Sequence, residues 1–154
     1  MTEENAPLVD RGHFIWSHFP KRENPGIPSN ERHIALCLRR LRHRSEGYLL
    51  VAVFTTTRPR GDRPKMKGEI EIPADRAAEF GQQSSFRIDV RRIAAMPLNS
   101  EFFPDLDNID HGLKGRSERL AETALKLFQE IAKETPELID FLGPESLRKS
   151  IFGR

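Results

Sequence analysis

Apolar and polar residues alternate most clearly at Phe86–Val90, where the sequence reads Phe-Arg-Ile-Asp-Val. This period of two predicts a half-buried strand, with the apolar side chains on one face and Arg87, Asp89 and Arg91 on the other. The apolar period slips directly after this segment, and a β-bulge near Arg91–Arg92 accounts for the slip. Because bulges are common beside active sites, this strand is a candidate site.

The spacing of Arg87 and Asp89 has two interpretations. Two residues apart on one strand face, they can bracket a phosphate, one as a hydrogen-bond donor and the other as a proton acceptor. The same spacing also fits an ordinary ion pair on the outer face of a sheet.

Other segments of the first hundred residues also show strand patterns. Tyr48–Phe54 is almost entirely apolar, which predicts a central strand covered on both faces, and it ends in Thr55-Thr56-Thr57. The basic segment Arg39–Glu46 before it is expected to form a turn. Pro20–Glu31 holds three prolines and predicts a long loop, a type of segment that is often functional. The remaining predicted strands are His13–Phe19, His33–Leu38 and Lys67–Ile72.

The hydrophobic period changes to 3.6 residues in the C-terminal part of the chain. The apolar stripe predicts an amphipathic helix over about Ser117–Lys133. Thr135-Pro136 resembles a helix N-cap with proline at the first helical position, so a second short helix is expected up to Gly143. Pro73–Phe80 predicts one or two helical turns, and Asn99–Gly115 is expected to be irregular. The residues of the stripe are Leu120, Ala124, Leu127, Phe128 and Ile131.

These patterns predict a mainly β fold with C-terminal helices. We expect one domain over residues 12–154, built from five or six largely antiparallel strands and a helical extension at about 117–151. Residues 1–11 are polar and show no period, so they are expected to be a flexible N-terminus.

Composition narrows the class of protein. A chain of 154 residues with 37% hydrophobic and 31% charged residues fits a soluble globular protein. No apolar run approaches the roughly 18 residues that a membrane span requires, and the N-terminus shows no signal peptide. The single cysteine, Cys37, fits a reducing environment, so a cytoplasmic location is expected.

The net charge of +2 is small, but the basic residues are concentrated in the middle of the chain. Basic loops of this kind favour a phosphate-bearing partner. The histidines are scattered without ligand spacing and no glycine-rich phosphate loop is present, so no metal or cofactor is expected. The two basic clusters consist of Arg39, Arg40, Arg42, His43 and Arg44, and of Arg58, Arg60, Arg63, Lys65 and Lys67.

The order of four motifs resembles the MazF/PemK toxins of toxin–antitoxin modules. Gly12–Phe19 is similar to the opening Gly-acid-Ile-Val-Trp strand of that family, and Arg32-His33 with the next five apolar residues resembles its Arg-Pro strand. Val51–Thr56 resembles its strand ending in Thr-Ser, and Phe86–Asp89 resembles the Arg-x-Asp strand of one branch. The chain departs from the family in having His33 in place of proline, no histidine in the first loop and a longer tail.

The resemblance implies a small SH3-like barrel of the CcdB/PemK type, closed here by amphipathic helices. It also implies a metal-independent endoribonuclease that cleaves single-stranded RNA, works as a homodimer and is silenced by a cognate antitoxin. Matched motif by motif, the implied catalytic residues are Arg32, Thr55, Arg87 and Asp89. Candidates for substrate binding are Thr56, Arg58, Arg91, His33 and His18.

The implied chemistry is attack of the RNA 2′-hydroxyl on the adjacent phosphorus. Asp89, held near Arg87, is the candidate base, and Arg87 and Arg32 would stabilise the anionic phosphorane. Thr55 would bond a phosphate oxygen or orient Asp89, and His33 or His18 is the candidate general acid. The alternative is a non-catalytic barrel of the same fold that binds nucleic acid or a protein such as gyrase.

Overall fold

A computed structural model describes residues 9–44, 47–56 and 64–143 of the chain. Its main feature is one seven-stranded sheet in the order β4-β5-β3-β2-β1-β6, with all neighbours on this path antiparallel. β7 lies off the path and pairs with β5 in parallel. The strands are β1 His13–Ser17, β2 His33–His43, β3 Gly47–Thr55, β4 Glu69–Ile72, β5 Phe86–Pro97, β6 Leu113–Arg116 and β7 Asp140–Leu142.

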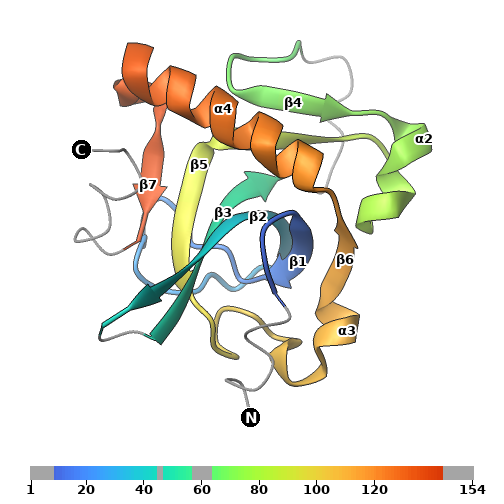
Figure 1. Cartoon of the computed structure of the whole chain (residues 1–154), viewed down its shortest axis with the longest axis vertical. Coiled ribbons are helices and arrows are strands. Elements are labelled where there is room, and N and C mark those ends of the chain that lie inside the picture. The colour runs from blue at the N-terminus through green and yellow to red at the C-terminus, as the bar shows by residue number, and fades with distance from the viewer. Residues whose placement is uncertain (1–8, 45–46, 57–63, 144–154) are drawn as a thin grey trace.

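The helices are short except for one near the C-terminus. That helix, α4, crosses one face of the sheet and contacts β5 and β2 (Figure 1). No described helix has the length and apolar character needed to cross a bilayer. The helical segments are α2 Ala74–Ala77, η2 Ala78–Phe80, η3 Leu106–Asn108, α3 Ile109–Gly112, α4 Glu118–Glu134 and η4 Pro136–Leu138.

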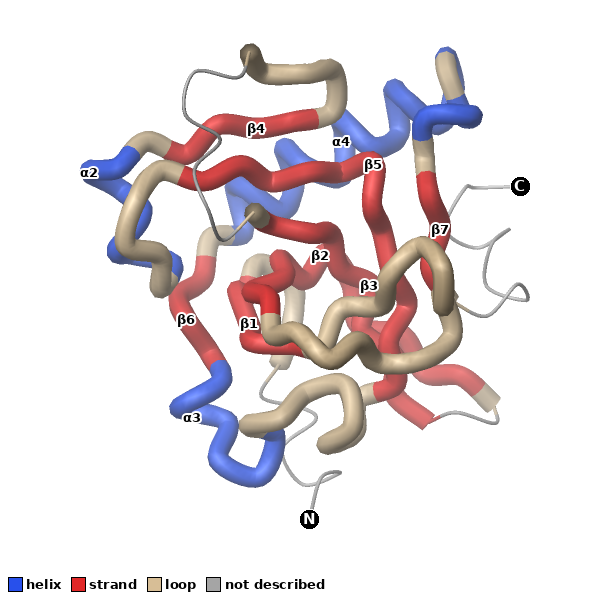
Figure 2. The backbone as a smooth tube through the Cα atoms, turned by 180° about the vertical axis from the view of Figure 1, so that it is seen from behind, coloured by secondary structure: helices blue, strands red, loops and turns tan. Residues whose placement is uncertain are grey.

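The predicted mainly β fold with a C-terminal helix is confirmed, whereas the sheet does not close into a barrel. β4 and β6, at the two ends of the strand order, do not pair with each other within the described residues. β6 packs instead against η2, where a side chain on Gly115 would collide with the Glu79 carbonyl oxygen. The short helical segment α2–η2 therefore separates the two edges (Figure 2).

Two apolar cores lie on opposite faces of the sheet, and β3 contributes to both. Alternate residues of β3 enter the core beneath α4 and the core beneath the segment Leu98–Ile109. The prediction that this strand is central and covered on both faces is confirmed. The predicted amphipathic helix is confirmed as α4, where the Ser117 Oγ accepts a hydrogen bond from the Leu120 amide at 3.1 Å. Its buried residues are Ala121, Ala124, Phe128 and Ile131.

Three segments differ from the sequence prediction. The basic segment expected to form a turn continues β2, pairing Arg39 with Val51 and onward to the hairpin end. The second C-terminal helix is limited to η4, because Asp140–Leu142 pairs with β5 and Leu142 enters a core. The segment expected to be irregular contains η3, α3 and β6.

The predicted bulge in β5 is confirmed. Val53 of β3 pairs with Ile93, and the next residue, Phe54, pairs with Asp89, so the intervening residues of β5 have no partner in β3. β5 bends there, its first half pairing with β4 and its second half with β7 (Figure 2).

The ends of the predicted domain fall partly outside the described residues. Residues 1–8 of the expected flexible N-terminus and residues 144–154 of the helical extension are among these. Val9 is buried, and its carbonyl oxygen accepts a hydrogen bond from Arg40 Nη1 at 3.1 Å.

Candidate functional site

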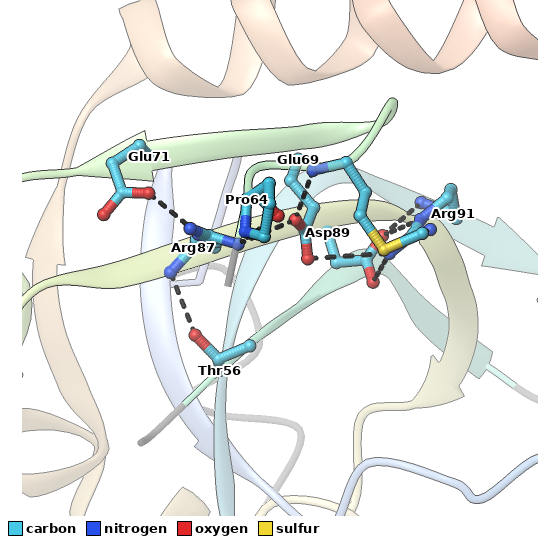
Figure 3. A network of polar contacts seen from close by, with 8 residues as sticks. Thr56, Pro64, Glu69, Glu71, Arg87, Asp89 and Arg91 are labelled. Atoms are coloured by element: carbon cyan, nitrogen blue, oxygen red, sulfur yellow. Dashed lines mark hydrogen bonds and ion pairs between the residues drawn. The ribbon is translucent and has the colours of Figure 1, made fainter. Parts of the chain in front are cut away.

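Charged side chains gather where β4 pairs with the first half of β5 (Figure 3). Glu71 lies opposite Arg87 and Glu69 opposite Asp89, so all four side chains share one face of the ladder. Arg87 donates from Nε to Glu71 at 2.8 Å and from Nη1 to Glu69 at 3.2 Å. The pKa of the Arg87 guanidinium is raised, and the hydrogen bond to Glu71 is the largest cause.

Asp89 is bound by Arg91 rather than by Arg87, which corrects the expected pairing. Arg91 donates to the Asp89 carboxylate from Nε at 2.8 Å, from Nη2 at 2.9 Å and from its backbone amide at 3.0 Å. Arg91 Nη2 also lies 3.5 Å from Glu69, whose side chain is 2% exposed. Strand parity already places Arg87, Asp89 and Arg91 on one face, and the register of β4 brings Glu69 and Glu71 to Arg87.

The two threonines at the end of β3 have separate surroundings. Thr55 is fully buried; its hydroxyl donates to the Ile34 carbonyl oxygen and accepts a hydrogen bond from Gln82 at 3.3 Å. The Thr56 hydroxyl accepts a hydrogen bond from the Arg87 amide at 2.9 Å. Thr56 therefore lies beside the charged cluster, while Thr55 is held within the protein.

Arg32 lies in a different place from the charged cluster. Its Nη2 is 2.6 Å from Asp105 Oδ2, and its guanidinium lies over the Trp16 ring, 5.2 Å from the centroid. These three residues line a cavity of about 270 Å³ together with His111 and Lys114. Among the described contacts, none brings Arg32 to Thr55, Arg87 or Asp89.

A second cavity, of about 400 Å³, opens beneath the loop between β1 and β2. Its cations are Lys21, Arg22 and Arg92, and its acids are Glu23 and Glu31. Arg22 is paired with Asp140 of β7, with Nε 2.9 Å from Oδ2. We call this the loop cavity; its full lining is Phe19, Lys21, Arg22, Glu23, Ser29, Glu31, His33, Phe54 and Arg92.

Arg92 is the unusual member of the loop cavity. Its guanidinium lies 3.9 Å from the centroid of the Phe54 ring and 5.9 Å from that of Phe19. Within the described part of the chain, it forms no hydrogen bond and no ion pair. Desolvation by burial lowers the pKa of Arg92 more than the attraction of Asp89, Asp140 and Glu23 raises it, yet an arginine stays protonated in proteins. The site therefore presents a half-buried cation whose charge no carboxylate contact compensates.

His33 faces the same cavity. Its ring lies 4.8 Å from the Phe54 centroid, and Nε2 is 3.5 Å from Glu31 Oε1. Burial lowers the pKa of His33 below its usual 6.5, more than the neighbouring Glu31 raises it. His33 is therefore neutral at pH 7, a state in which imidazole accepts a proton.

The two other candidates for substrate binding are His18 and Arg58. His18 is half-buried, and its Nδ1 has no hydrogen-bond partner in the described structure. Arg58 lies outside the described residues. In the described ranges, no three His, Cys, Asp or Glu side chains are grouped so that they could hold a metal ion.

The sequence analysis named His33 as a candidate and did not name Arg92, Lys21 or Arg22, which line the same cavity. The loop containing Lys21 and Arg22 was expected to be functional, but no residue within it stood out. The predicted bulge was a signal in the sequence that could have pointed to Arg92, since a bulge often turns the side chains of adjacent residues in new directions. Arg91 and Arg92 then face different surroundings, and each needs its own interpretation.

Comparison with models of known families finds no match, and comparison with curated proteins finds none either.

Proposed function

We propose that this protein is a metal-independent endoribonuclease that cleaves single-stranded RNA, as the resemblance to MazF/PemK toxins implies, and that the reaction takes place in the loop cavity. The observation that carries the proposal is Arg92, a half-buried guanidinium without a carboxylate partner among the described residues. A protein tolerates such a desolvated cation at some cost in free energy, and binding of an anion offsets that cost.

The lining of this cavity suits a phosphodiester. Arg92 and Lys21 provide positive charge for the phosphate, and the ring of Phe54 provides an apolar surface beside it. Single-stranded nucleic acids are commonly bound by this combination of cations and aromatic rings. The volume, about 400 Å³, lies within the range of roughly 300–1,000 Å³ for small-ligand sites.

His33 supports a catalytic role for the cavity. Neutral His33 takes the proton of the 2′-hydroxyl at Nε2, because its Nδ1 is buried. The 2′-oxygen forms a bond to the adjacent phosphorus while the bond to the 5′-oxygen breaks. The leaving 5′-oxygen takes a proton from water. Arg92 stabilises the charge that develops on the non-bridging oxygens, and Glu31 stabilises the imidazolium. The products are a 2′,3′-cyclic phosphate and a 5′-hydroxyl.

The charged cluster on β4 and β5 supports this site indirectly. Its contacts hold Arg91 on the β4 side of the bulge, which leaves Arg92 directed at Phe54. We therefore assign Asp89 and Arg87 to positioning the bulge. Their direct action on RNA, and that of Arg32 and Thr55, remains a prediction from the resemblance.

The same resemblance suggests the biological setting. We propose a growth-inhibiting toxin that acts in the cytoplasm as a homodimer and is held inactive by a cognate antitoxin. This part of the proposal is supported by the motifs alone.

The decisive experiment is RNA cleavage in the presence of EDTA. Purified protein, free of antitoxin, is incubated with single-stranded RNAs of varied sequence, and the ends of the fragments are analysed. The expected result is cleavage with 2′,3′-cyclic phosphate and 5′-hydroxyl ends, and no cleavage where the scissile nucleotide is 2′-deoxy. Intact RNA at all sequences would contradict the proposal, as would 5′-phosphate ends.

A non-catalytic binder of nucleic acid, or of a protein such as gyrase, is the second candidate. It is favoured by the bonding of the four implied catalytic side chains, because Arg32, Thr55, Arg87 and Asp89 each have partners within the protein. Binding of RNA without cleavage would support this candidate.

A further inference from the structure

The segment Glu31–His33 separates two cavities. Glu31 and His33 line the loop cavity, while the residue between them, Arg32, lines the cavity with Trp16. Alternate residues of an extended segment point to opposite sides, and consecutive Cα atoms lie only about 3.8 Å apart. The two cavities are therefore neighbours across one short stretch of backbone.

The cavity on the Arg32 side of this segment has the composition of a nucleotide site. Trp16 is half-buried, with the Arg32 guanidinium 5.2 Å from its ring centroid, and Lys114 adds a second cation. Asp105 neutralises one charge by binding Arg32, which leaves the positive charge of Lys114 facing the cavity. At about 270 Å³ the space is near the lower end of ligand-site volumes, which suits one planar ring.

We propose that this second cavity, which we call the tryptophan cavity, binds the base of a nucleotide next to the one held in the loop cavity. The Arg32 guanidinium already lies over the Trp16 ring, and the base extends this stack on the outer side of Arg32, while Lys114 contacts the adjoining phosphate. Stacking on aromatic rings binds every kind of base, so the site contributes affinity with little sequence preference. The inference rests on the proposed binding of single-stranded RNA, but it does not require cleavage.

Trp16 provides a direct readout, because it is the only tryptophan of the chain. The probe is a hexamer of 2′-O-methyl RNA, which cannot be cleaved because it has no free 2′-hydroxyl. It is titrated into the full chain in EDTA while tryptophan fluorescence is recorded, with free N-acetyltryptophanamide as the correction for light absorption. The expected result is saturable quenching that weakens as salt is raised.

Two variants test the assignment of residues. Lys114→Gln keeps most of the side-chain stem and is expected to weaken binding about 3- to 10-fold, as loss of one phosphate contact does. Trp16→Ala, followed with a labelled hexamer, is expected to weaken binding between about 5-fold and 100-fold. Lys126→Ala is the matched control, since Lys126 lies exposed on α4 and pairs with Glu122 at 3.6 Å.

The results separate this inference from the proposed function. Quenching that Lys114→Gln weakens, in a protein that cleaves no RNA, supports the tryptophan cavity and contradicts the ribonuclease. Cleavage of RNA with no change in Trp16 fluorescence overturns the tryptophan cavity and leaves the ribonuclease intact. If Trp16→Ala lowers the melting temperature, Lys114→Gln alone decides, and unchanged affinity in that variant overturns the inference.

Discussion

Arg91 and Arg92 are neighbours in the bulge of β5, and their surroundings are opposite. Arg91 makes three hydrogen bonds to Asp89 and approaches Glu69, on the side where β4 lies. Arg92 lies over Phe54, facing the loop cavity, and makes no ion pair with any described residue. The hydrogen bond to Asp89 raises the pKa of Arg91, whereas burial lowers the pKa of Arg92, so the two differ both in their carboxylate contacts and in desolvation.

This difference shows which charges are available to a ligand. Around Arg87 and Arg91, three carboxylates face two guanidinium groups, so the cluster on β4 and β5 has no excess of positive charge. A phosphate there would have to displace a carboxylate, whereas no carboxylate among the described residues contacts Arg92. An Arg-x-Asp motif is therefore not enough to locate an anion site, because the partners decide its net charge.

The largest effect is expected from Arg92→Ala. Removal of this guanidinium, which no described carboxylate contacts, should lower RNA cleavage about 10²- to 10³-fold, as loss of one group that stabilises developing charge typically does. Arg39→Ala is the control, since Arg39 lies exposed on the β2–β3 hairpin and should change cleavage little. Cleavage rates of the two variants under single-turnover conditions provide the measurement. If Arg92→Ala and Arg39→Ala lower the cleavage rate equally, Arg92 contributes no more to the reaction than an exposed arginine does.

Arg91→Ala should mainly affect stability. It leaves Asp89 buried without its cation, while Glu69 keeps its contact with Arg87, and the change costs about 3 kcal/mol in unfolding free energy, near the lower end for broken buried pairs. Arg92→Ala should cost less, about 1–2 kcal/mol, because it loses cation–π contacts with Phe54 and Phe19 but leaves no carboxylate without its partner. Urea unfolding of both variants compares them directly, and a larger loss in Arg92→Ala would reverse the comparison.

Asp89→Asn separates a positioning role from a catalytic one. The amide keeps one acceptor oxygen but loses the charge that holds Arg91, so stability should fall by about 1–3 kcal/mol. At a temperature where the variant is folded, cleavage should stay within a few-fold of wild type. A loss of about 10²- to 10⁴-fold in folded protein would instead identify Asp89 as the general base.

The smallest expected effect is the pH dependence of stability through His33. Burial places the folded-state pKa of His33 below the unfolded value of 6.5, so the unfolded chain binds more protons between these two values. Stability should therefore fall as the pH drops through 6.5 towards the folded-state pKa. His13 shifts in the same direction, mainly through desolvation, and will add to the effect.

Melting temperatures between pH 7.5 and pH 5.5 measure this dependence. The slope should be shallower in His33→Gln than in wild type, because glutamine does not titrate. If the two slopes are identical, His33 is not buried as a neutral group, and its proposed role as a base loses support. The cleavage rate of the wild-type protein should also fall with decreasing pH over this range.

Local patterns in the sequence were enough to predict most of the secondary structure. The alternation at Phe86–Val90 and the slip after it predicted β5 and its bulge, and the 3.6-residue period predicted α4. The apolar run of β3 predicted a strand covered on both faces. These predictions succeeded because each depends on neighbours within one element, where a buried face imposes its period on the sequence.

Only the tertiary structure decided how the arginines are partnered and where the cavities lie. Glu69 and Glu71 reach Arg87 and Arg91 through the register of β4 against β5, which no local pattern specifies. β7 was expected to be helical and became a strand because β5 offered it a pairing edge. Arg92 of β5 meets Phe54 of β3 in a cavity that His33 of β2 also lines. Charge compensation depends on such long-range contacts, so the sequence determined the elements while their packing determined which cation is available.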